Sequence, residues 1–295
     1  MYFDRNNIIL QPVRNDALDK KNITLHIARF DLLHPVVSGN KFYKLYYFLE
    51  KAVTLPTTHL QTYGGAYSNH LVATAYAAQA AGISCTGIVR GERPASLSAA
   101  LLDCESYGIE LSYISREQYA SECLHYEAGD QLLSIPEGGY HPLGAKGAAL
   151  MYDDAALQEA THICLAAGTA TTLAGLLQKA KPEQDMIAVP VLKGFHDMQE
   201  RLAFLNGKPD YPNLHIWNDY HFGGYAKKDN RLLEFMNHLY ETYELPTDMV
   251  YTSKLLYAVF DQLNRNYFPP GSRIICLHTG GLQGNRSLPG GTLIF

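Results

Sequence analysis

The chain has 295 residues, of which 47% are apolar and 18% charged, so it is long and apolar enough to bury a core. This balance is that of a globular protein and argues against a disordered chain or a coiled coil. A formal net charge of −5 gives no electrostatic reason to expect nucleic acid or an anionic membrane as a partner.

Signals for export, membrane insertion and metal binding are missing from the sequence. The first seven residues lack the basic head and apolar run of a signal peptide, and no later run approaches the ~20 apolar residues of a membrane span. The five cysteines form no Cys-x-x-Cys pair, and the twelve histidines show no metal-ligand spacing. We therefore expect a cytoplasmic protein with reduced thiols, no membrane partner and no metal.

Apolar, β-branched runs alternate with longer amphipathic runs along the chain. In the first half, this pattern predicts strands at 23–29, 59–64, 84–91 and 109–115, and helices from Phe42, at 68–81 and at 96–107. After Gly138 it predicts strands at 162–165, 186–191, 214–217 and 274–278, and helices at 171–179, 197–205, 231–243 and 252–263. Strands that alternate with helices predict an α/β fold of two units, each a mostly parallel sheet flanked by helices.

The strongest break in this pattern is the Gly/Pro-rich stretch from Pro136 to Gly144, between the two halves. It is typical of a linker or of an active-site loop, and the sequence leaves both open.

A lysine stands where a turn gives way to a helix, in Ser38-Gly-Asn-Lys41. One interpretation is a capping turn with Lys41 as a solvated first-turn residue. The other is a lysine whose pKa is lowered by burial beside a helix start, which makes it a nucleophile for a carbonyl group.

Two further strand-to-helix junctions carry small and hydroxylic residues. Gly64-Gly-Ala-Tyr-Ser-Asn-His70 opens an Ala-rich helix, where backbone N–H groups and the Ser68 hydroxyl suit a carboxylate. Gly168-Thr-Ala-Thr-Thr172 follows a strand and suits a phosphate. The chain lacks the P-loop motif and the Gly-x-Gly-x-x-Gly fingerprint, so a monophosphate fits better than a dinucleotide, and a Rossmann-type reductase is disfavoured.

The motifs taken together resemble the fold-type II, tryptophan synthase β-like pyridoxal-phosphate enzymes, and within them the family of D-cysteine desulfhydrase and 1-aminocyclopropane-1-carboxylate deaminase. The resemblance extends in order along nearly the whole chain. Its motifs are His34-Pro-Val-Val-Ser-Gly-Asn-Lys41, Gly64–His70, Pro136-Glu-Gly-Gly139, Gly168–Thr172, Val250-Tyr-Thr252 and His278-Thr-Gly-Gly281.

This resemblance implies pyridoxal 5′-phosphate as cofactor and a role for each matching residue. Lys41 would form the internal aldimine and move the substrate's α-proton. The remaining cofactor-binding residues would be Asn69 at the ring hydroxyl, Gly168, Thr169, Ala170, Thr171 and Thr172 around the phosphate, and Thr252 and Thr279 near the ring nitrogen. The substrate side would comprise Gly65, Ala66, Ser68, Asn69 and His70, with Tyr225 and Tyr251 as further catalytic residues beside Ser68.

The implied activity is an α,β-elimination on a small D-amino acid, with D-cysteine giving pyruvate, ammonia and hydrogen sulfide. The deaminase branch carries a glutamate where this chain has Thr252, which favours elimination over cyclopropane ring opening. Deamination of 1-aminocyclopropane-1-carboxylate and a non-catalytic, cofactor-binding relative remain the alternatives.

The resemblance also implies a homodimer and two domains, a large one formed by residues 1–43 and 139–295 and a small one formed by residues 44–138. Some positions depart from the family pattern. Tyr43 and Ala28 replace basic residues, and Ala170 and Thr171 stand where glycines are usual. Because added Cβ atoms hinder close backbone approach, the last two bear on how the cofactor is retained.

Overall fold

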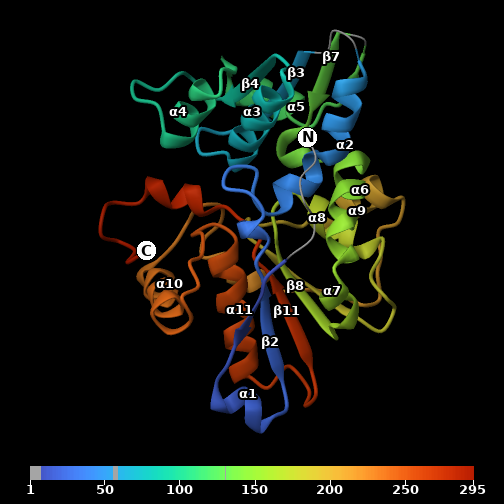
Figure 1. The fold of residues 1–295 in the computed structure, drawn as a ribbon, viewed down its shortest axis with the longest axis vertical. Helices are drawn as coiled ribbons and strands as arrows, with labels where there is room; N and C mark the ends of the chain where they lie inside the picture. Colours follow the sequence, from blue (N-terminus) through green and yellow to red (C-terminus); the bar gives the residue numbers. More distant parts are fainter. Residues whose placement is uncertain (1–7, 56–58, 130) are drawn as a thin grey trace.

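The structure is a computed structural model that describes residues 8–55, 59–129 and 131–295. Figure 1 shows two groups of strands, with β3, β4 and β7 in one and β2, β8 and β11 in the other. Within the described residues the larger sheet has the strand order β1-β2-β11-β8-β9-β10. Its strands are β1 (Leu10–Val13), β2 (Thr24–Ala28), β8 (His162–Ala167), β9 (Asp185–Pro190), β10 (Leu214–Ile216) and β11 (Arg273–Leu277).

The second sheet has the order β5-β4-β3-β7-β6. Its strands are β3 (His59–Gly64), β4 (Cys85–Arg90), β5 (Glu110–Ile114), β6 (Glu127–Ala128) and β7 (Leu132–Ile135). Among the described residues only β1 and β6 pair antiparallel with their neighbours, and all other strand pairs are parallel. The predicted α/β fold with two mostly parallel sheets is confirmed.

The helices lie in the connections between successive strands. They are α1 (Asp16–Lys20), α2 (Asn40–Thr54), α3 (Asn69–Ala81), α4 (Ala99–Ser106), α5 (Arg116–Glu122), α6 (Pro142–Ala149), α7 (Ala155–Glu159), α8 (Thr171–Leu177), α9 (Met198–Asn206), α10 (Asn230–Tyr243) and α11 (Thr252–Asn264). Local chemistry explains several of their ends. Ser68 and Asp229 accept backbone N–H bonds as N-caps of α3 and α10, and Gly82 ends α3 in the left-handed conformation.

The predicted strands and helices agree with these bounds to within a few residues. The sequence pattern missed short elements, namely β1, β6, β7, α1, α5, α6 and α7. The Gly/Pro-rich stretch from Pro136 is not a plain linker, because it forms the 3₁₀ turn Glu137–Gly139 and then begins α6 at Pro142. None of the helices in the described ranges is both long and apolar enough to cross a membrane.

The two sheets share a core. One cluster of buried side chains includes Phe48 on α2, Leu71 on α3, Leu133 on β7 and Ile163 on β8. The strands of the larger sheet come from residues 10–28 and 162–277, and those of the smaller sheet from residues 59–135. Because apolar packing continues between the sheets, the domain boundaries at residues 43 and 138 stay a prediction.

Three helices meet at distances that only glycine permits. A Cβ atom at Gly147 of α6 would lie 2.1 Å from the carbonyl oxygen of Tyr43 on α2, and one at Gly175 of α8 would lie 2.4 Å from that of Ala145. Real Cβ atoms do not approach backbone so closely, so α2, α6 and α8 pack backbone to backbone. This contact fixes the start of α2 relative to the start of α8.

A methyl group at this contact should therefore destabilise the fold. We expect Gly147→Ala to lower the free energy of unfolding by about 1–3 kcal/mol, because α2 and α6 must separate to admit it. Gly284→Ala is the matched control, since a Cβ there meets no atom within 4 Å. Urea unfolding of both variants checks this, and equal midpoints would contradict the packing argument.

Candidate active site

A cavity of about 310 Å³ opens where the strands of both sheets end. Of the candidate site residues predicted from the sequence, only Thr252 does not line it. The lining ones are Lys41, Gly65, Ala66, Ser68, Asn69, His70, Gly168, Thr169, Ala170, Thr171, Thr172, Tyr225, Tyr251 and Thr279. The structure thus brings together segments that are more than 200 residues apart, at the carboxyl ends of β3, β8 and β11.

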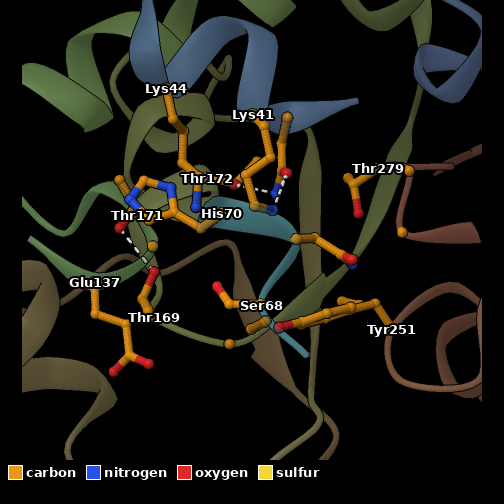
Figure 2. A pocket seen from close by; sticks show the side chains of 18 of the residues that line it. Lys41, Lys44, Ser68, His70, Glu137, Thr169, Thr171, Thr172, Tyr251 and Thr279 are labelled. Carbon is orange, nitrogen blue, oxygen red and sulfur yellow. Dashed lines mark hydrogen bonds between the residues drawn. The ribbon is translucent and has the colours of Figure 1, made fainter. Parts of the chain in front are cut away.

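Lys41 lies in the first turn of α2 and points into the cavity (Figure 2). The turn before it is tightly packed, since a Cβ at Gly39 would lie 2.0 Å from the carbonyl oxygen of Thr279. The Lys41 ammonium donates to Asn40 Oδ1 at 2.7 Å, and Asn40 Nδ2 donates to Thr172 Oγ1 at 2.9 Å. This chain of hydrogen bonds links the lysine to the start of α8.

Burial lowers the pKa of Lys41 to about 8, and the carboxylate of Asp248 opposes this shift. Asp248 is buried and accepts the backbone N–H groups of Val250 and Tyr251 with Oδ2, each at 2.9 Å, and that of Thr252 with Oδ1 at 2.8 Å. It therefore supplies a held negative charge behind the cavity. Near neutral pH the Lys41 amine is neutral far more often than a solvated lysine.

Thr252 lies behind the cavity wall. Its hydroxyl donates to Asp248 Oδ1 at 2.6 Å and accepts from the Asp248 backbone N–H at 2.9 Å. Both hydrogen-bonding capacities are thus used at the start of α11. Thr279, in contrast, lines the cavity. Direct contact between Thr252 and a group in the cavity stays a prediction, and this geometry does not favour it.

Lys44 lines the cavity as well, and sequence reasoning missed it. It is 4% exposed, and burial, reinforced by the charge of Lys41, lowers its pKa well below the ordinary value. The described residues offer it no ion-pair partner. The signal was available, because Lys44 follows Lys41 by three residues and precedes the buried Phe48 by four, which places these side chains on one helix face. A buried, unpaired ammonium indicates an anion site.

His70 lies beside Lys44 and Thr171 in Figure 2, away from Ser68. Its Nε2 is 2.9 Å from Thr62 Oγ1, and burial together with the charges of Lys44 and Lys41 keeps its pKa low. The structure therefore groups His70 with the lysines of α2 rather than with the predicted carboxylate site around Ser68.

The segment from Gly168 to Thr172 turns sharply from β8 into α8. Ala170 adopts the left-handed conformation with φ of 64°, which costs a non-glycine residue about 1–2 kcal/mol. The hydroxyls of Thr169 and Thr171 lie 2.9 Å apart, and a Cβ at Gly168 would lie 3.2 Å from the Tyr251 ring. The chain keeps this turn even with alanine where glycine is usual, and Thr169 and Thr171 line the same cavity as Lys44 and His70.

Ser68 caps α3 by accepting the Leu71 N–H at 3.2 Å, which leaves its own O–H free to donate into the cavity. Next to it, Asn69 Oδ1 is buried without a hydrogen-bond partner among the described residues. An unsatisfied buried acceptor costs about 1–3 kcal/mol and so points to a missing ligand group. Arg90 and Glu137, which sequence reasoning also missed, add opposite charges to the lining.

The described residues contain no group of three or more His, Cys, Asp or Glu side chains that could hold a metal ion. The five cysteines are free and buried. The cavity lining combines amines, hydroxyls and amides with the Arg90 and Glu137 side chains, the His70 imidazole and the rings of Tyr67, Tyr225 and Tyr251.

Comparisons with known proteins agree with this chemistry. A family model described as "Pyridoxal-phosphate dependent enzyme" matches residues 15–280. The chain is 27% identical to a D-cysteine desulfhydrase from Salmonella paratyphi A, over 87% of this chain and 86% of the relative.

Solved structures of related enzymes share the fold of this chain. A crystal structure titled as that of the ACC deaminase homologue superposes with a TM-score of 0.77 and 25% identity, covering 97% of this chain and 92% of the other. A fungal L-serine ammonia-lyase from Rhizomucor miehei superposes with a TM-score of 0.67 at 13% identity, covering 93% of each chain, which shows a shared fold alone.

The lowered pKa of Lys41 predicts its reactivity in the cofactor-free protein. Competitive acetylation, read by mass spectrometry, should show Lys41 labelling that rises with pH around a midpoint near 8, because only the neutral amine is a nucleophile. Asp248→Asn should move this midpoint further down, since the carboxylate raises the pKa. A midpoint near the ordinary 10.5 would show that burial does not act on this amine.

Proposed function

The chain belongs to the family of pyridoxal-phosphate dependent enzymes, and from this membership we propose that it catalyses an α,β-elimination on a small D-amino acid, with D-cysteine as the first candidate. The reaction would convert D-cysteine and water to pyruvate, ammonia and hydrogen sulfide. The observation that carries the proposal is a lysine amine of lowered pKa that shares one cavity with an anion site and a serine-capped helix start.

The residues of the cavity fit the cofactor. Lys44, a buried cation without an acidic partner in the described ranges, together with the Thr169 and Thr171 hydroxyls, suits a phosphate. Asn69 has a buried side-chain oxygen that needs a donor, as a ring hydroxyl would supply. Lys41 provides the amine that a carbonyl-bearing cofactor requires. The roles of Lys41, Asn69, Thr169 and Thr171 match the ones that the sequence motifs imply, whereas the role of Lys44 is not among them.

The protein's own groups would then divide the work. The Ser68 hydroxyl and the backbone N–H groups at the start of α3 bind the substrate carboxylate and so orient the α-carbon. Lys41 Nζ takes up the α-proton, because its lowered pKa leaves a neutral amine near pH 8. When bound, the cofactor supplies the electron sink for this proton loss.

Two tyrosines close the substrate side. Tyr225 and Tyr251 line the cavity with ring centroids 6.2 Å apart in an edge-to-face contact, and Lys41 Nζ lies 6.0 Å from the Tyr251 ring centre. They narrow the space beside Lys41, which favours a short side chain such as that of cysteine. Water near the reacting carbon is excluded by the same rings.

1-Aminocyclopropane-1-carboxylate is the second candidate, because the ACC deaminase homologue covers 97% of this chain. The argument against it is Thr252, whose position carries a glutamate in the deaminase branch that the sequence resembles. In this chain the nearest carboxylate, Asp248, is bound by the turn before α11. D-Cysteine therefore remains the first candidate substrate. A homodimer remains a prediction.

The activity test compares three substrates with the cofactor-loaded protein. D-Cysteine should release pyruvate and sulfide, while L-cysteine and 1-aminocyclopropane-1-carboxylate should release little keto acid. Lys41→Ala should lower the rate by about 10²–10⁴-fold, as expected when a proton-transferring group is lost. Lys51→Met, an exposed lysine of the same helix, is the control.

Other outcomes of this test select other readings. Release of 2-oxobutyrate from the cyclopropane substrate, in place of pyruvate, would favour the deaminase. Full activity of Lys41→Ala would refute the role of that lysine, and a protein that retains cofactor but turns over none of the three would be a binding relative or act on another amino acid.

The anion site is tested by binding rather than by turnover. Lys44→Met should weaken the affinity for pyridoxal 5′-phosphate by about 10- to 100-fold, because a charge-assisted hydrogen bond to a phosphate oxygen is lost. Affinity for pyridoxal, which lacks the phosphate, should not change. Fluorescence titration measures both, with the exposed Lys146→Met as control. Equal losses for the two ligands would place Lys44 elsewhere than at the phosphate.

A further inference from the structure

Lys254 is a lysine with no exposed surface that lies outside the cavity. It is the third residue of α11, one turn after Tyr251. Burying an ammonium group costs several kcal/mol unless acceptors surround it, so its partners indicate what the chain uses it for.

The partners of Lys254 are two backbone carbonyls of one loop. Its Nζ donates to the carbonyl oxygens of His221 at 2.8 Å and Gly224 at 2.7 Å. Each of these oxygens also accepts a turn hydrogen bond, from Gly224 N at 3.0 Å and from Lys227 N at 3.1 Å. The ammonium therefore joins two consecutive turns, and we call residues 221–226 the Tyr225 loop.

The backbone of this loop is strained. Phe222 and Ala226 both have φ of 53°, in the left-handed region that non-glycine residues avoid, and Gly223 and Gly224 have φ of 91° and 121°. Four positive φ angles within five residues are held only when surrounding contacts impose them. Two hydrogen bonds from a buried ammonium are such contacts.

The loop also carries a wall of the cavity. Tyr225 lines it, 42% exposed, with its ring edge-to-face against that of Tyr251. Tyr251 directly precedes α11, and Lys254 lies in the first turn of the same helix. The start of α11 is thus connected to both tyrosines. Tyr251 directly precedes the helix, and Tyr225 belongs to the loop that Lys254 binds.

We infer that Lys254 is a positioning residue, whose ammonium holds the Tyr225 loop in its strained form so that Tyr225 stands against Tyr251 on the substrate side of the cavity. The inference rests on the proposed function only in that substrate occupies this side. The cofactor-binding segment from Gly168 to Thr172 is separate from the loop, so Lys254 acts on substrate binding rather than on cofactor retention.

The first test needs neither cofactor nor substrate. Lys254→Met should speed hydrogen–deuterium exchange of backbone amides in the Tyr225 loop by at least 10-fold, with α8 and β8 unchanged. In Lys254→Ala, whose shorter side chain leaves space, added methylammonium can occupy that space and should restore slow exchange. The control is Lys193→Met, because Lys193 is exposed and its Cβ lies 3.4 Å from the position that a Cβ at Gly224 would take.

The second test is kinetic. Lys254→Met should raise KM for the best substrate about 10-fold or more with a smaller change in kcat, and the pyridoxal 5′-phosphate affinity should stay the same. In a double-variant cycle, adding Lys254→Met to Tyr225→Ala should cost little more than Tyr225→Ala alone. Should Lys254→Met fail to fold, Lys254→Gln keeps an N–H donor and should give intermediate exchange and KM.

Unchanged exchange in the loop, or fully additive losses in the cycle, would overturn the inference. Inactivity of the unmodified protein toward D-cysteine would instead refute the proposed function, and the exchange measurement would still decide the role of Lys254.

Discussion

Two lysines in one turn of α2 set the constraint on which the rest of the site depends. Lys41 and Lys44 bring two amines into the same low-dielectric cavity, where burial lowers the pKa of both and the charge of Lys41 lowers that of Lys44 further. Such a pair is costly unless the surroundings compensate it. Asp248 favours the charged form of Lys41, whereas Lys44 has no ion-pair partner among the described residues.

The packing of the helices explains how this pair is held. Glycines 147 and 175 let α6 pass backbone to backbone between α2 and α8, so the lysine-bearing turn and the threonine-bearing turn cannot drift apart. The hydrogen bonds from Lys41 through Asn40 to Thr172 cross the same gap. Rigid placement of this kind lowers the reorganisation that catalysis would otherwise require.

The start of α11 positions the cavity wall that contains Tyr225 and Tyr251. Asp248, Tyr251 and Lys254 lie within two turns, and they supply a charge, a cavity wall and an anchor for the Tyr225 loop. One short segment therefore links the electrostatics of Lys41 to the shape of the cavity wall at Tyr225 and Tyr251. The buried carboxylate and the buried ammonium of this segment also stabilise each other, because Asp248 favours the charged form of Lys254.

The sequence by itself determined the order and type of the long elements, the turn that presents Lys41 and the hydroxyl-rich turn after β8, because these depend on periodicity and on neighbouring residues. Only the tertiary structure decided which side chains face the cavity. Thr252 belongs to a recognisable motif, but its hydroxyl donates to Asp248 and not to a group in the cavity. Lys44 belongs to no such motif, yet it lines the cavity. Lys254 finds its partners some thirty residues upstream. Such choices depend on burial and on contacts between distant segments, which a local pattern does not contain.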